Sequence, residues 1–403
     1  MSTKASARKV SVPTVTIGNW DQSLAAARNG KMSIDDLIKL ADQLQQQNAI
    51  DKIDALYSAW IDNSTSPLRF IACFNYGVLL ANWGRTTDAI RVYERAIEVN
   101  PGFAQPRINL GLTLEREGKQ EEAIQHWRAV VDDPVVAAAA PMEMKTTALN
   151  HVGRLREIQR SYDVAEAALR ESLTLNPSQP DALHHWFHLR QKQCKWPSVE
   201  EFGEVSKNRI IRAMSPLACL AFEDDPAFQM FIADRIVKEK FTYPVAPLAA
   251  GSGYRHSRVR VGYLSGDLCT HAVGLLLPEI FEQHDREKFE IYAYDYSRED
   301  GTPLRQRYKD VTEHFVSIAH LSDIDAAKKI REDEIDILVD LHGLSLGIRA
   351  GILAQRPAPI QMTYLGYIGT TMMPYIDYVI TDRYSLPEEL RAYYSEKPLY
   401  LDR

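Results

Sequence analysis

The chain has 403 residues, of which 45% are hydrophobic and 25% charged, and its formal net charge is −7. This length exceeds one ordinary core and predicts two or three domains. The acidic balance gives no electrostatic reason to expect nucleic acid or an anionic membrane as a partner.

The amino-terminal segment and the cysteines indicate a cellular compartment. Residues 1–20 are polar and broken by proline and glycine, so we expect a disordered start rather than a signal core. No run approaches the roughly 18 apolar residues of a membrane span. The four cysteines are scattered without paired spacing, which favours free thiols in a reducing compartment. We therefore expect a cytoplasmic protein.

Residues 21–179 contain an internal helical repeat. The residues that recur after 34 positions are Gly77, Ala89 and Tyr93, which correspond to Gly111, Ala123 and Trp127. This period and this pattern of small and aromatic residues are typical of tetratricopeptide repeats, which are stacked helix pairs. A third unit has Gly153, Ala165 and Leu169 at the same internal offsets, and a degenerate pair at 33–63 precedes the array.

The small residues have a physical role in each repeat. Gly77 and Ala89 let two helices approach closely, and we expect Tyr93 to fill the gap to the next repeat. Pro101 ends the second helix, because proline cannot continue one.

The second half of the chain changes its period. Residues 180–257 are first helical and then rich in proline and glycine, so we expect a helical adaptor followed by a linker. From residue 258 apolar strands alternate with helices, which predicts a Rossmann-like, doubly wound parallel sheet over 258–403. The expected strands are 258–265, 289–297, 314–318, 335–343, 360–367 and 376–382. The expected helices are 276–281, 302–311, 322–334 and 346–355.

The loop after the first strand carries Asp267 and His271, and ligands of an open parallel sheet bind beyond the carboxyl ends of its strands. His271 lies close to the start of a helix, whose dipole disfavours the imidazolium form. A neutral imidazole can accept a proton or orient a hydroxyl nucleophile. A hydrogen bond to the loop backbone is the alternative role for this histidine.

Two further loops offer polar groups at the same edge. His342 could contact an acceptor or a phosphate, or it could be packed against the backbone, and we expect Arg349 to be a structural ion-pair partner. Gly366, Gly369 and Thr370 form a loop whose amides and hydroxyl suit an oxygen-rich ligand. A tight structural turn is the alternative for this loop.

Six segments in this half resemble the catalytic region of O-linked N-acetylglucosamine transferases and the related SPINDLY proteins, in the family's order. They are RVRVGYLSGDLCTHAVGLLLPEIFEQHDREKFEIYAY, DGTPLR, IDILVDLHG, RPAPIQMTYLGYIGTT, YIDYVITD and YYSEKPLYL. Tetratricopeptide repeats upstream are also this family's architecture. The resemblance covers roughly residues 67–403.

The resemblance implies a two-lobed B-type glycosyltransferase. Such an enzyme moves a sugar from a nucleotide sugar, typically UDP-N-acetylglucosamine, to Ser or Thr hydroxyls of proteins, and it needs no metal ion or other cofactor. The family's active-site histidine falls on His271. The residues that we expect to bind substrate are Asp267, His342, Gly366, Gly369 and Thr370. Ile368 stands where the family usually has proline.

The resemblance also implies a second lobe, which carries most nucleotide contacts in B-type enzymes. The chain ends at Arg403, just after the first lobe's YSEKPLYL. We therefore expect a partial chain with half of the active site, little turnover alone, and acceptor proteins bound in the repeat groove. A non-catalytic, repeat-based scaffold for partner proteins is the alternative.

Overall fold

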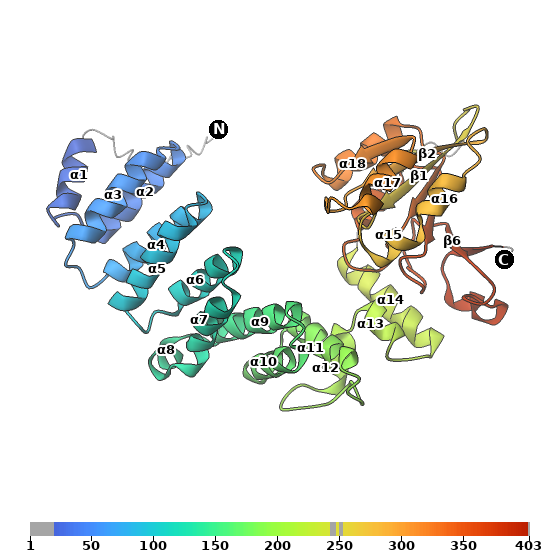
Figure 1. Ribbon diagram of the computed structural model, residues 1–403. Helices are drawn as coiled ribbons and strands as arrows, with labels where there is room; N and C mark the ends of the chain where they lie inside the picture. The colour runs from blue at the N-terminus through green and yellow to red at the C-terminus, as the bar shows by residue number, and fades with distance from the viewer. Residues whose placement is uncertain (1–19, 242–246, 250–252, 402–403) are drawn as a thin grey trace, which may run out of the picture. The chain divides into compact units, whose positions relative to one another are not determined.

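The protein is described here by a computed structural model that covers residues 20–241, 247–249 and 253–401 (Figure 1). These residues form two compact units that divide between Arg209 and Ile210, and we name them the repeat unit and the sheet unit. The division falls inside the segment expected as adaptor and linker. The expected disordered start, apart from Trp20, lies outside the described residues, as does much of the linker.

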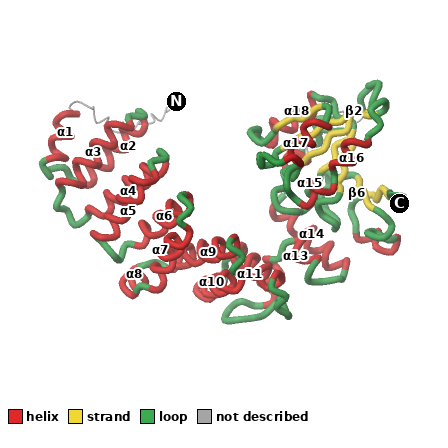
Figure 2. Tube along the Cα trace, in the orientation of Figure 1, coloured by secondary structure: helices red, strands yellow, loops and turns green. Residues whose placement is uncertain are grey.

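The repeat unit consists of helices joined mostly by short loops, with a longer segment, residues 193–206, before its last helix (Figure 2). Its helices are α1 (Trp20–Arg28), α2 (Ile34–Gln46), α3 (Ile50–Asn63), α4 (Arg69–Asn82), α5 (Thr86–Val99), α6 (Ala104–Arg116), α7 (Gln120–Asp132), α8 (Pro134–Ala139), α9 (Met142–Ile158), α10 (Tyr162–Leu175) and α11 (Pro180–Lys192). The expected repeats are the pairs α4–α5, α6–α7 and α9–α10, and short α8 occupies the longer spacing before the third. A further helix, α12 (Lys207–Ala213), spans the division.

Each repeat closes over a glycine. The pairs are Gly77 with Tyr93, Gly111 with Trp127 and Gly153 with Leu169. A Cβ atom at Gly77 would lie 2.5 Å from the Tyr93 ring. Tyr93 therefore fills space between the two helices of its own repeat, and its hydroxyl also reaches the next repeat, where it hydrogen-bonds Asn109 of α6. The missing Cβ of Gly77 leaves room for the ring inside the pair.

The sheet unit holds one parallel sheet of seven strands in the order β3-β2-β1-β4-β5-β6-β7. Its strands are β1 (Val259–Ser265), β2 (Phe289–Asp295), β3 (His314–Ser317), β4 (Ile337–Asp340), β5 (Ile360–Tyr364), β6 (Tyr378–Thr381) and β7 (Lys397–Tyr400). Its helices are α13 (Pro216–Leu220), α14 (Pro226–Lys240), α15 (Ala272–Leu276), α16 (Pro278–Gln283), α17 (Pro303–Val311), α18 (Asp323–Glu332), α19 (Ala350–Ala354) and the 3-10 helix η1 (Glu388–Tyr393). The predicted fold class is confirmed.

Three local features differ from the sequence expectation. The expected helix 276–281 is two helices, α15 and α16, because Pro278 has no N–H to continue α15 and begins a new helix instead. Helix α19 is shorter than expected, and strand β7 was not expected.

The sheet packs on both faces. Leu264 and Leu338 belong to a core with α18 and α19, whereas Tyr263 and Val339 belong to a second core with α15, α16 and α17. Successive residues of a strand point to opposite faces, so these strands are apolar throughout, as a buried parallel sheet requires.

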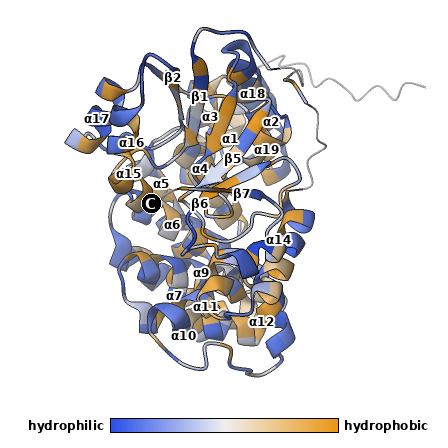
Figure 3. Ribbon diagram, turned by 90° about the vertical axis from the view of Figure 1, so that its right-hand side faces the viewer, coloured by the Kyte–Doolittle hydropathy of each residue, from blue (hydrophilic) through white to orange (hydrophobic). Residues whose placement is uncertain are grey.

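Apolar and polar residues alternate around the helices, as Figure 3 shows. This pattern is expected for helices that bury one face. None of the described helices is long and apolar enough to cross a membrane. All four cysteines are free thiols.

Candidate functional site at the carboxyl edge of the sheet

The site lies where the strand order reverses. Strands β1 and β4 are neighbours, but β1 is followed in sequence by β2 on one side and β4 by β5 on the other. The loops after them therefore leave in opposite directions and flank a crevice at the carboxyl edge, the usual ligand position in such sheets. Asp267 and His271 lie in the first loop and His342 in the second, and the fold brings these three predicted residues together.

The loop after β1 is fixed through its backbone. The Leu268 N–H donates to Ser297 Oγ at 2.8 Å, and the Thr270 N–H donates to Asp300 Oδ2 at 2.8 Å. These bonds tie the loop to the segment that follows β2. The geometry of the loop is therefore set by the fold and does not depend on a ligand.

Arg305 adds a buried support under the same loop. Its guanidinium donates to both oxygens of Asp295, at 2.8 and 2.6 Å, and to the Leu268 carbonyl at 3.1 Å. The charge-assisted bond to Asp295 raises the pKa of Arg305. The two-point contact between Arg305 and Asp295 offsets part of the desolvation cost of burying both charges.

The carboxylate of Asp267 lies between the two histidines. Its Oδ2 is 3.4 Å from His271 Nδ1 and 3.5 Å from His342 Nε2. This arrangement gives the crevice one negative group flanked by two imidazoles, which could orient a hydroxyl or accept a proton.

His271 is the N-cap residue of α15, and its side chain is 49% exposed. Its Nδ1 accepts a hydrogen bond from the Val273 N–H at 3.3 Å, which places the ring proton on Nε2. The exposed nitrogen is then a donor. For Nε2 of His271 to accept a proton, the ring must be the other tautomer, in which Nδ1 carries the proton and donates a hydrogen bond to Asp267. Helix α15 has only five residues, so its dipole acts less on His271 than the sequence argument assumed.

His342 is only 2% exposed and stacks on the Tyr296 ring at 5.5 Å. Its Nε2 accepts a hydrogen bond from the Gly266 N–H at 2.9 Å, and its Nδ1 is 3.3 Å from Ser345 Oγ. Burial lowers the pKa of His342, so the ring is neutral near pH 7 with its proton on Nδ1. These contacts fit the packed role, and the expected substrate contact of His342 stays a prediction.

The glycines of the loop after β5 allow close approach between segments. A Cβ atom at Gly366 would lie 2.8 Å from the carbonyl carbon of Leu341, and one at Gly369 would lie 2.7 Å from the Tyr367 hydroxyl. The space beside both glycines is therefore filled by protein. Their expected contact with substrate stays a prediction.

The hydroxyl of Thr370 is engaged within the protein. It donates to Glu396 Oε2 at 2.8 Å, while the Thr371 N–H donates to Glu396 Oε1 at 2.7 Å. The Thr371 hydroxyl also hydrogen-bonds Glu396. Glu396 is 3% exposed and anchors the loop. The Thr370 contact with substrate remains a prediction, and Ile368 is the exposed residue at the loop tip.

The prediction for Arg349 is confirmed. Its Nε donates to Asp323 Oδ1 at 2.8 Å, and its other nitrogens donate to the carbonyls of Ile318 and Leu321. The guanidinium is thus occupied by structural partners.

The sequence analysis missed two buried carboxylates of the site. Asp340 ends β4, is 1% exposed, and accepts from the Gly343 N–H at 2.7 Å. Glu396 was overlooked because its partners lie 25 and 26 positions earlier in the chain. An acidic residue that closes the apolar run IDILVD was an available signal for Asp340, whereas nothing local marked Glu396.

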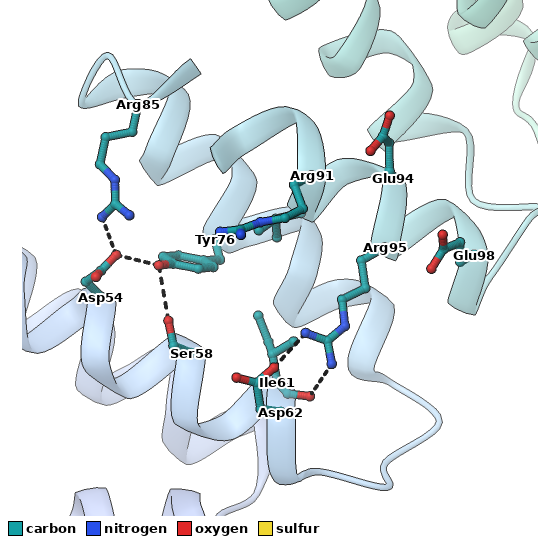
Figure 4. Close-up of a pocket in the computed structure, with 11 residues that line it drawn as sticks. Asp54, Ser58, Ile61, Asp62, Tyr76, Arg85, Arg91, Glu94, Arg95 and Glu98 are labelled. Carbon is teal, nitrogen blue, oxygen red and sulfur yellow. Dashed lines mark hydrogen bonds and ion pairs between the residues drawn. The ribbon is translucent and has the colours of Figure 1, made fainter. Parts of the chain in front are cut away.

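The repeat unit has a separate hollow of about 450 Å³ beside α3, α4 and α5. Figure 4 shows that several of its charged side chains pair with one another. Arg95 donates to Asp62 at 2.7 Å, and Asp54 accepts from both Arg85 and the Tyr76 hydroxyl. Charges of both signs line this hollow, and they give no clear sign of the ligand that it would bind.

The comparisons with known proteins match both units. Residues 233–403 match the family model Glycosyl transferase family 41, and residues 71–103 and 92–125 match two tetratricopeptide repeat models. An O-GlcNAc transferase mutant from Thermobaculum terrenum has a similar fold, with a TM-score of 0.51, 24% identity, and coverage of 83% of this chain and 57% of that chain.

Two curated relatives are similar in sequence. The probable UDP-N-acetylglucosamine–peptide N-acetylglucosaminyltransferase SEC of Arabidopsis thaliana is 33% identical over 234 residues, which are 53% of this chain and 24% of that protein. The UDP-N-acetylglucosamine–peptide N-acetylglucosaminyltransferase of Caenorhabditis elegans is 39% identical over 145 residues, which are 36% of this chain and 13% of that protein. The chain therefore spans about a quarter or less of these relatives.

Proposed function

Because residues 233–403 match the model of glycosyl transferase family 41, we propose that this chain is part of a protein O-glycosyltransferase. The reaction is transfer of N-acetylglucosamine from UDP-N-acetylglucosamine to a Ser or Thr hydroxyl of an acceptor protein, in the cytoplasm. The similarity to peptide N-acetylglucosaminyltransferases that use UDP-N-acetylglucosamine supports this donor and acceptor class. The proposal includes no metal ion and no cofactor.

One observation carries the proposal. Within the family 41 segment, Asp267, His271 and His342 converge at the point where the strand order reverses. A polar cluster held by a rigid backbone at this edge is what orientation of an acceptor hydroxyl requires.

The chemistry follows from the positions of the side chains. The acceptor oxygen attacks the anomeric carbon, the bond to UDP breaks, and the hydroxyl proton must be removed. Exposed His271 is the residue placed to contact the reacting groups, either as a hydrogen-bond donor from Nε2 or, with Nδ1–H on Asp267, as a base. Buried His342 holds the loop in place.

The diphosphate of the donor requires positively charged groups. The two arginines near this edge, Arg305 and Arg349, are already paired with carboxylates and do not supply them. Arg305 is bound to Asp295 and Arg349 to Asp323. Stabilisation of a leaving diphosphate is a large catalytic contribution. The proposal therefore places most donor contacts in protein outside the described residues and the acceptor protein along the repeat unit.

A transfer assay on the full chain tests this function. With UDP-N-acetylglucosamine and a Ser/Thr-containing acceptor protein, we expect slow glycosylation, detected by mass spectrometry, that is lost in His271→Ala and retained in the surface control Asp382→Asn. Transfer that is equally fast in His271→Ala would refute the site. Robust transfer by the chain alone would refute the placement of the donor contacts. A chain that binds acceptor proteins but never transfers sugar would favour the scaffold alternative.

A further inference from the structure

Asp340 is a buried carboxylate that the proposed chemistry does not use. Its Oδ2 accepts from the Gly343 N–H at 2.7 Å, and the backbone N–H of His342 supports the same carboxyl group. Its Oδ1 makes no hydrogen bond within the part of the chain that the structure describes. A half-satisfied buried carboxylate is costly, so its presence calls for a physical reason.

The surroundings of Asp340 contain two more buried polar atoms without a hydrogen bond among the described residues, Thr363 Oγ1 and the Tyr296 hydroxyl. Asp340 and Thr363 are register partners on β4 and β5, so their side chains share one face of the sheet. Tyr296 stacks on His342, which begins the turn after β4. Asp340 is thus in a polar compartment directly beneath that turn.

The turn connects Asp340 to the candidate site. Gly343 has φ +55°, and a Cβ atom there would lie 2.5 Å from Tyr367 Cβ, so the backbone has little freedom at this position. His342, held by the turn, accepts from the Gly266 N–H at 2.9 Å. Gly266 directly precedes Asp267, and the Asp267 carboxylate flanks His271.

We propose that Asp340 is a positioning residue whose ionised carboxylate sets the turn 341–347 and, through His342, the loop that presents Asp267 and His271. An ionised carboxylate accepts stronger hydrogen bonds from the backbone N–H groups of His342 and Gly343 than the protonated acid does. Uptake of one proton by Asp340 therefore loosens the turn and the hydrogen bond between His342 and Gly266.

Proton uptake by Asp340 falls in the physiological range. Burial raises the pKa of Asp340 to about 7, against the opposing effect of the Gly343 and His342 N–H groups. Tyr296, which directly follows β2, is a titratable side chain near Asp340, and Asp267 from the loop after β1 acts on the same tyrosine. Arg349 and Asp323 complete the charged surroundings, and both act on Tyr296.

Nuclear magnetic resonance of the full chain tests this coupling through two backbone amides. We expect the amide shifts of Gly343 and Gly266 to share an inflection near pH 7. The inflection should vanish from both in Asp340→Asn, which keeps an oxygen for the Gly343 N–H but cannot ionise. In His342→Gln the Gly343 inflection should persist and the Gly266 inflection should be lost.

Asp382→Asn is the matched control. Asp382 follows β6 and accepts from the Tyr384 and Ser385 N–H groups at 2.7 and 2.8 Å. Asp340, at the end of β4, likewise accepts from N–H groups of the turn that follows it. It is more exposed, and its replacement should leave both inflections unchanged.

Two results would overturn the proposal. One is a wild-type Gly266 amide shift without an inflection between pH 6 and 8. The other is a Gly266 inflection that is unchanged in folded Asp340→Asn. If Asp340→Asn fails to fold, the pH titrations of the Gly343 and Gly266 amide shifts in wild type and His342→Gln still test the proposal. The role of Asp340 in catalysis rests on the proposed function, but these measurements use no donor or acceptor. They therefore fail or succeed independently of sugar transfer.

Discussion

The two histidines of the site carry their protons on different nitrogens. Nδ1 of His271 accepts from the Val273 N–H, whereas Nε2 of His342 accepts from the Gly266 N–H. The same residue type thus has two roles, an exposed group that faces the crevice and a buried group that supports a loop. The backbone donor beside each ring determines the difference.

We expect this difference to be visible in nitrogen chemical shifts. In ¹⁵N-histidine-labelled chain above pH 7, His342 should be the Nδ1–H tautomer and His271 the Nε2–H tautomer. Asp267→Asn should leave both assignments unchanged. A His271 ring with its proton on Nδ1, lost in Asp267→Asn, would instead favour the base role.

Asp340 should also make stability depend on pH. Its folded-state pKa is raised from 3.8 to about 7, so the folded state binds more protons than the unfolded state between these values. Its contribution to the free energy of unfolding therefore falls as pH rises from about 4 to about 7 and is constant above that. Asp340→Asn cannot ionise, so this fall in the free energy of unfolding is absent from the variant.

We expect the stability of Asp340→Asn relative to wild type to increase from pH 5 to pH 8, by up to about 3 kcal/mol. Urea unfolding at several pH values measures it. A difference between the two proteins that does not change with pH would contradict the raised pKa.

At the scale of elements, contacts between a glycine and a large side chain determine the repeats. The sequence predicted the repeats because the spacing of these residues is periodic, and the structure shows the glycine facing the aromatic or leucine side chain. The contact of the Tyr93 ring with Gly77 in its own repeat, beside its hydrogen bond to Asn109 of the next, was not predicted, since spacing alone does not give side-chain contacts.

Gly111→Ala should destabilise the repeat unit. A Cβ atom there would lie 2.5 Å from Cε2 of fully buried Trp127, and we expect a net loss of about 2 kcal/mol in chemical unfolding. Gly102→Ala is the control, because its Cβ would meet the nearest side chain at 3.5 Å, an ordinary contact. Equal stability of the two variants would contradict the close packing.

The loop after β5 depends on Glu396 from the start of β7. Glu396→Ala leaves the Thr370 hydroxyl and the Thr371 N–H without their partner, and we expect a loss of about 2–4 kcal/mol and faster hydrogen exchange at Thr371. Glu388→Ala, which removes only an exposed ion pair with Arg391, should cost less than about 1 kcal/mol. Unchanged exchange at Thr371 in Glu396→Ala would show that the loop does not need this anchor.

At the scale of the whole molecule, the sequence predicted both architectures, because each has its own period along the chain. The position of Asp267 and His271 at the carboxyl edge could also be predicted, since both follow a strand, while their role in the reaction stays a prediction. Asp340 had a local signal, because it closes the apolar run IDILVD, whereas Glu396 and Arg305 could not be predicted, because their partners lie in other loops. The local sequence gives residue types and spacing, but only the fold shows which buried groups share a partner.

The central claim is that the edge that carries His271 takes part in binding a nucleotide sugar. Because most donor contacts are proposed to lie elsewhere, we expect this chain to bind the donor weakly but detectably at millimolar concentration. The most direct measurement is amide chemical-shift mapping of the full chain during titration with UDP-N-acetylglucosamine up to millimolar concentration. We predict shifts at Gly266, Asp267, Gly343 and the Gly366 loop that weaken in His271→Ala and persist in Asp382→Asn. Shifts confined to helices α1–α11, or no shifts at millimolar donor, would contradict the claim.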